Sequence, residues 1–165
     1  MMRWNTEKTR EVAAGLDLRN LLALDHSRLE QQFDALIATF ESDAHADAAR
    51  MWSDFAAELQ HHFALEEKHV FPEFAKVAKA EVATLAYEHA ELRDKLRQLC
   101  AGVNAHITRA EAIADFIQTL RLHAKREDAL VYRWAQANLS PQTQASLRKS
   151  LARTIHSVLG LAKSA

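Results

Sequence analysis

Two short segments place a histidine and a glutamate four residues apart in stretches whose apolar spacing predicts helix. The first runs from His62 to Glu66 and the second from His123 to Glu127. Four residues make about one turn of an α-helix, so the two members of each pair share one helix face. Burying imidazole and carboxylate groups on apolar faces is costly unless they are compensated. The two pairs therefore predict a metal site between helices.

Glycine and proline are rare and stand where helices are expected to begin, bend or end. The 165 residues include only Gly15, Pro72, Gly102, Pro141 and Gly160. Because these residues interrupt helices, their positions leave long stretches free for helix formation. The pattern predicts an all-α chain. A hydrophobic content of 48% suffices for one core, so a single domain is expected over residues 1–165.

Apolar side chains that recur every three or four residues predict four long helices. Together with a short piece and a last helix, the expected segments are about 17–41, 48–71, 72–79, 82–102, 108–134 and 141–159. Because the connections are short, sequential long helices are expected to be antiparallel. This predicts an up-down-up-down antiparallel four-helix bundle with a core of about 17–137, an N-terminal arm over residues 1–15 and an extra C-terminal helix.

Each expected long helix has one histidine in its apolar stripe, namely His26, His62, His89 and His123. Counted from the turns that separate the helices, all four lie at nearly the same depth. A single buried histidine more often bonds a neighbouring polar group than a metal, so a hydrogen-bonded polar core is the alternative. Four imidazoles gathered with two carboxylates favour the metal, because ionised carboxylates in a dry interior need compensation.

The expected donors are imidazole nitrogens and carboxylate oxygens. A set without thiolates disfavours a structural zinc site and suits iron or manganese. Glu66 and Glu127 come from opposite sides of the bundle, so each is expected to bridge two metal ions while the histidines bind at the two ends. The residues thus predict a dinuclear centre.

The combined pattern resembles the hemerythrin-like (HHE cation-binding) domain family. The resemblance covers about residues 17–137 and rests on His26, His62 with Glu66-Glu67 and Val70-Phe71-Pro72, Glu88-His89, and His123 with Glu127-Asp128. It implies the same bundle around a non-haem di-iron centre, two iron ions joined by an oxo or hydroxo bridge. The four histidines then serve as terminal ligands and Glu66 as one bridging ligand.

The second bridging ligand is open between Glu127 and Asp128. Glu127 stands four residues after His123, as in the bacterial and regulatory branch of the family, whereas Asp128 stands five after, as in the oxygen carriers. The apolar seam favours Glu127. Asp128 and Glu67 are then expected to be solvated or to support the ligands.

The third helix departs from the oxygen carriers at Arg93, where those proteins have a second histidine. Arginine does not ligate iron, so reversible oxygen carriage is not expected, and we expect Arg93 to polarise a peroxide instead. The remaining candidates for a fifth imidazole are His45, His61 and His69. Surface or packing roles are the simpler interpretation of these three.

These features predict a protein that binds or senses oxygen, nitric oxide, peroxide or iron. They favour such a binding or sensing protein over an enzyme. The alternatives are a di-iron enzyme that consumes peroxide and a protein of iron-cluster repair or iron handling. The expected partners are a small diatomic or peroxide ligand and a signalling protein. A net charge of -1 with mixed signs argues against nucleic acid. The absence of a long apolar stretch or leader-like start predicts no membrane association and a cytoplasmic location.

Overall fold

The computed structural model describes residues 17–40, 45–104 and 110–161, and the expected N-terminal arm lies outside these ranges. The described residues form α2 (Leu18–Phe40), α3 (His45–His69), α4 (Phe71–Asn104), α5 (Ala110–Ala129), α6 (Val131–Asn138) and α7 (Pro141–Leu161). No strand occurs in this part of the chain. The prediction of an all-α protein is confirmed for it.

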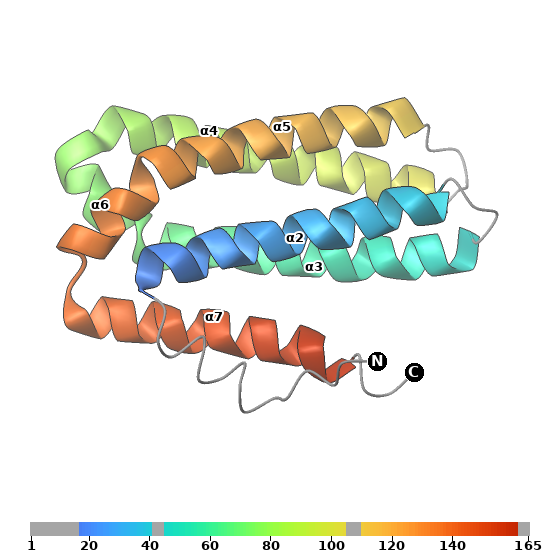
Figure 1. Cartoon of the computed structure of the whole chain (residues 1–165). Coiled ribbons are helices and arrows are strands. Elements are labelled where there is room, and N and C mark those ends of the chain that lie inside the picture. The colour runs from blue at the N-terminus through green and yellow to red at the C-terminus, as the bar shows by residue number, and fades with distance from the viewer. Residues whose placement is uncertain (1–16, 41–44, 105–109, 162–165) are drawn as a thin grey trace.

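Helices α2, α3, α4 and α5 lie side by side along their lengths (Figure 1). Each packs on the next in chain order, and α2 also contacts α5, so the four enclose a common core. Helix α7 lies along the outside of this group and contacts α2 and α3. The predicted helical bundle is confirmed. None of the described helices is long and apolar enough to cross a membrane.

The chain bends between α3 and α4 where Pro72 predicts it. Helix α3 ends at His69 and α4 begins at Phe71, because the proline ring has no N–H to continue the backbone hydrogen bonds of α3. Ala78, with φ −142° and ψ 55°, interrupts α4 soon afterwards. The expected short helical piece before the third long helix is therefore present.

The prediction of one continuous helix over residues 108–134 is wrong. Helix α5 ends at Ala129, and α6 begins at Val131 after Leu130, whose backbone has φ −111° and ψ −61°. Neither glycine nor proline lies near this break. The break changes the direction of the chain (Figure 1), and Val131, Tyr132 and Ala135 are buried beyond it.

The C-terminal helix begins as expected and packs on the bundle. The Ser140 hydroxyl accepts a hydrogen bond of 3.1 Å from the Thr143 backbone N–H, which caps the helix, and Pro141 is the first helical residue. Leu147 and Leu151 are fully buried in the same cluster as apolar residues of α2 and α4. Helix α7 therefore extends the core.

The apolar core consists of two clusters with a polar layer between them. On α2, for example, Leu21 and Leu22 belong to one cluster and Leu29 and Phe33 to the other. The buried polar residue Asp25 lies between them. The buried polar side chains of the described residues are Asp25, His62, Glu66, His89, His123 and Glu127. Burying a large apolar side chain contributes about 1.5–3 kcal/mol, so the two clusters support a layer that is unfavourable alone.

Candidate metal centre

The four bundle helices deliver the six predicted ligands to the polar layer. Helix α2 contributes His26, α3 His62 and Glu66, α4 His89, and α5 His123 and Glu127. Glu66, His89 and Glu127 are completely buried. The His26 side chain is 12% exposed, so it marks the side of the layer that is nearest to solvent.

The six side chains form two overlapping groups, in each of which the potential ligand atoms lie within 4.8 Å of one another. The groups are His26, His62, Glu66 and Glu127, and Glu66, His89, His123 and Glu127. Both glutamates belong to both groups, whereas each histidine belongs to one. This is the arrangement expected when two ions share two carboxylates.

The two carboxylates lie between the imidazole rings. Oε2 of Glu66 is 3.5 Å from Nε2 of His62 and 3.4 Å from Nε2 of His89. The Glu127 carboxylate lies 3.1 Å from Nε2 of His123 and 3.5 Å from Nε2 of His26. Each glutamate therefore approaches histidines of both groups.

Several of these buried atoms have no hydrogen-bond partner. They are Oε2 of Glu66, Nε2 of His89, Nε2 of His123 and both carboxylate oxygens of Glu127. A buried polar atom without a partner is costly, and a buried charge more so. Nitrogen and oxygen atoms that converge without hydrogen bonds fit a metal-binding role, and the absence of sulfur from both groups suits iron or manganese.

Each histidine also faces a carboxylate with its other ring nitrogen, Nδ1. The pairs are His62 with Asp25 at 2.9 Å, His89 with Glu67 at 2.9 Å, His123 with Glu88 at 2.8 Å, and His26 with Asp128 at 3.5 Å. A carboxylate beside Nδ1 favours the imidazole tautomer that carries its proton on Nδ1. The lone pair of Nε2 is then free to bind a metal ion at the centre. Hydrogen bonds from three of these carboxylates thus orient His62, His89 and His123, and Asp128 faces His26 without a hydrogen bond.

These four acids form a closed ring around the bundle. Each is adjacent in sequence to one of the six central residues and reaches the histidine of a neighbouring helix. Asp25 of α2 holds α3, Glu67 of α3 holds α4, Glu88 of α4 holds α5, and Asp128 of α5 faces α2. The interpretation of Glu67 and Asp128 as supporting residues agrees with these contacts, whereas sequence analysis missed Asp25 and Glu88.

Tyr132 of α6 was also missed, and it lies inside the site. Its hydroxyl donates a hydrogen bond of 2.5 Å to Oε1 of Glu66 and lies 2.9 Å from Nε2 of His26. Burial and the nearby Glu66 raise the pKa of Tyr132 well above its usual range, so the phenol stays protonated. Its sequence position gave no signal, because the break at Leu130 separates it from the helix that carries Glu127.

In the metal-free protein, the carboxylates of the centre favour the protonated form of the histidines that they face. Burial lowers the pKa of His26 and His89, but the facing carboxylates outweigh it and raise both to about 10. Asp128 and Glu127 have the larger effects at His26, and Glu127 and Glu66 at His89. A metal ion therefore has to displace protons from these rings, and its affinity should increase with pH.

Glu127, not Asp128, faces the interior. Glu127 is completely buried, whereas the Asp128 side chain is 43% exposed and lies beside His26. His61 is exposed and His69 half-buried, and within the described residues neither joins the two groups. The side chain of His45 lies outside the described residues.

Arg93, which was expected to polarise a peroxide, forms an ion pair with Glu67. Its Nη1 and Nη2 donate to the two Glu67 oxygens at 2.7 and 3.0 Å, and its guanidinium lies 5.3 Å from the centre of the Phe63 ring. Burial alone would raise the pKa of Glu67, but Arg93 and His89 outweigh burial and hold the pKa below its usual value. Arg93 therefore supports the acid that orients His89, and it does not line the cavity that reaches the site.

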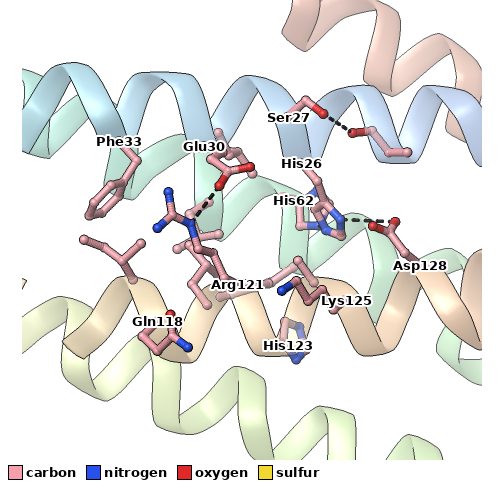
Figure 2. Close-up of a pocket in the computed structure, with 17 residues that line it drawn as sticks. His26, Ser27, Glu30, Phe33, His62, Gln118, Arg121, His123, Lys125 and Asp128 are labelled. Carbon is pink, nitrogen blue, oxygen red and sulfur yellow. Dashed lines mark hydrogen bonds and ion pairs between the residues drawn. The ribbon is translucent and has the colours of Figure 1, made fainter. Parts of the chain in front are cut away.

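That cavity has a volume of about 580 Å³ and lies beside the histidines (Figure 2). His26, His62 and His123 form part of its wall, and the remaining lining residues come from α2, α3 and α5. The rings of Phe63, which also lines the cavity, and Phe71 stack on His89 with centroid distances of 4.1 and 5.1 Å. The site is thus open toward α2 and α5 and closed around His89.

Four histidines and two glutamates come together in one layer of this helical bundle. This arrangement defines a metal-binding protein of the histidine–carboxylate class. The family model for the hemerythrin HHE cation binding domain matches residues 17–135, and the chain belongs to this family. Comparison with curated proteins and with solved structures gives no significant match.

Asp25 orients His62 through a buried hydrogen bond, and this contact contributes to the stability of the fold. Burial raises the pKa of Asp25, but its hydrogen bond to His62 and the Arg28 charge lower it from 3.8 to about 2. A lowered pKa stabilises the fold above pH 3.8, and this contribution is lost as the pH falls to 2. Asp25→Asn should therefore destabilise the metal-free protein by roughly 2 kcal/mol at pH 7, and by much less at pH 2.

Urea denaturation of the metal-free variant and parent at several pH values measures this difference. Asp34→Asn is the matched control, because Asp34 is on the same helix and is 63% exposed beside Arg121. It should change stability by less than about 1 kcal/mol. An Asp25→Asn effect that is equal at pH 7 and pH 2 would contradict the assigned cause.

Proposed function

We propose that the chain binds two iron ions, with His26 and His62 at one, His89 and His123 at the other, and Glu66 and Glu127 bridging them. The proposal includes an up-down-up-down antiparallel arrangement of α2, α3, α4 and α5. The main support is that both glutamates belong to both groups of potential ligands. Iron fits the nitrogen and oxygen donors and is the typical metal of the family.

We further propose that this centre binds or senses oxygen, nitric oxide or peroxide. Bound iron would supply redox chemistry toward these molecules. The protein supplies access from one side, because the cavity reaches His26, His62 and His123. Stacked aromatic rings exclude water around His89. A small ligand is therefore expected to arrive on the α2 and α5 side.

A peroxide-consuming enzyme is the second candidate, and Tyr132 favours it. The phenol hydroxyl lies 2.9 Å from Nε2 of His26 and 3.4 Å from Nε2 of His62, two histidines that border the cavity, although Tyr132 itself does not line it. A protonated hydroxyl at this place can donate a hydrogen bond to a ligand that binds at the centre beside these histidines. Tyr132→Phe separates the candidates, because turnover of peroxide should fall while iron content stays unchanged.

Metal analysis and an optical spectrum test the centre itself. Protein made with iron available should contain about two iron ions per chain and show the absorption of an oxo-bridged pair, because two groups of donors are present. Each ion requires its own two histidines, so His26→Ala and His89→Ala should each lower the iron content toward one. Iron-replete protein that contains zinc alone and lacks this absorption would exclude the di-iron centre.

A further inference from the structure

The cavity beside the centre is much larger than the small ligands proposed above. Its volume of about 580 Å³ lies within the range of roughly 300–1,000 Å³ that is usual for small-molecule sites. A molecule of the size of water takes up only about 30 Å³, and oxygen, nitric oxide and peroxide are of comparable size. The volume therefore leaves room for an organic molecule.

The inner wall of the cavity is apolar. It is formed by side chains that are all at most 4% exposed: Leu29, Phe33, Leu59, Phe63 and Ile117. The α2 residues that line the cavity run from Ala23 to Phe33, and the part from His26, beside the centre, to Phe33 corresponds to roughly 10 Å of helix. This is about the length of an extended chain of eight carbon atoms. The wall fits an aliphatic chain.

The outer rim is charged, and most of its charges are already paired. Arg121 of α5 reaches across to α2, with Nε 2.7 Å from Glu30 (Figure 2). Its Nη2 lies 3.3 Å from Asp34. Asp128 faces Nδ1 of His26. For Lys125, no ion pair with another described residue is present in the structure. Lys125 is thus the cation at the rim that is available to a ligand.

We propose that the cavity binds an aliphatic monocarboxylate of about eight carbons, with its carboxylate at Lys125 and its chain against the apolar wall. One ammonium group matches one negative charge. The nearby acids Glu30, Asp34 and Asp128 disfavour a ligand that carries more than one negative charge. The bound acid covers the route to His26, His62 and His123. Such a ligand controls the access of smaller molecules to the centre.

Calorimetric titration of the metal-free protein with octanoate tests the binding without depending on iron. Acetate lacks the chain and 1-octanol lacks the charge, so both should bind more weakly than octanoate. Lys125→Gln should weaken octanoate binding about three- to fivefold, as for an exposed ion pair. Lys79→Gln removes an exposed lysine of α4 that does not line the cavity and should have no effect.

A second variant pair tests the position of the chain. Ile117→Trp fills the cavity and should abolish octanoate binding, whereas Leu122→Trp places the same ring on the same helix at a residue that is 58% exposed and should not. Failure of wild-type protein to bind millimolar octanoate would overturn the proposal. Equal binding of octanoate and 1-octanol, with no effect of Lys125→Gln, would also overturn it.

The blocking effect is measured separately in iron-loaded protein. Saturating octanoate should at least halve the rate at which azide changes the iron spectrum, and the Ile117→Trp variant should not respond to octanoate. An unchanged azide rate with octanoate bound would refute the control of access. Absence of iron would refute the proposed function instead and would leave the calorimetric result unaffected.

Discussion

The Glu66→Ala/Glu127→Ala variant is expected to bind neither iron ion. Both glutamates belong to both groups of potential ligands, so removing them deprives each ion of its carboxylate oxygens and of its connection to the other. The four histidines remain, but two neutral imidazoles alone hold an iron ion weakly in competition with water. The measurement is iron per chain after loading and desalting, together with the optical spectrum.

Asp128→Ala is the matched control for this variant. Asp128 is adjacent to Glu127 in sequence but faces the outer nitrogen of His26. Its removal leaves all six central side chains in place, so both ions should still bind, with affinity reduced about 10- to 100-fold for the ion at His26. Retention of one full equivalent of iron by the double alanine variant would contradict the shared role of the glutamates.

A second double variant separates metal binding from folding. Glu66 and Glu127 are fully buried among imidazoles, so alanine at both positions leaves a cavity and removes the carboxylates that the histidines face. Glu66→Gln/Glu127→Gln keeps the shape of both side chains while the neutral amides are poor ligands. Loss of both ions from this variant, with unchanged circular dichroism, assigns the effect to ligation.

The bundle and its six central residues could be predicted because helical periodicity carries this information locally. His62 and Glu66 share a helix face whatever the rest of the chain does, and the same holds for His123 and Glu127. The equal depth of the four histidines follows from counting residues along short-loop helices. Glu127 could be favoured over Asp128 on the same basis, since only Glu127 continues the apolar stripe.

The supporting residues could not be predicted in the same way. Asp25 and Glu88 lie next to His26 and His89 in sequence, and adjacent residues on a helix point about 100° apart. Whether they reach water or the next helix depends on how closely the helices pack. Tyr132 depends on the break at Leu130, which has no glycine or proline to signal it. The cavity likewise arises from side chains of three helices that leave space between them.

The contrast between the two sides of the centre is the part of the structure with the most direct consequence for reactivity. His89 is enclosed by Phe63 and Phe71, whereas His26 and His62 border a cavity whose rim is solvated. Storage of oxygen on iron would require a closed, dry pocket, because water and protons promote irreversible oxidation of the iron.

The reduced iron protein is therefore expected to oxidise rapidly in air instead of storing oxygen. The four histidines and two glutamates that would hold the ions offer too few donor atoms to fill every position of two such ions. Positions would then stay open to ligands, and an open position makes a metal site reactive. The Arg93 charge is not needed for this expectation, since Glu67 neutralises it. Stopped-flow mixing with oxygenated buffer measures the rate.

Variants of the cavity identify the cause of the rapid oxidation. Ile117→Trp fills the space beside the histidines and should slow oxidation several-fold by limiting water and oxygen, whereas the exposed Leu122→Trp should leave the rate unchanged. Arg93→Lys keeps a positive charge beside Glu67 and should also have little effect. A coloured oxygenated form that lasts for many minutes and returns oxygen under vacuum would contradict the expectation. It would mean that the solvated cavity does not determine the stability of bound oxygen.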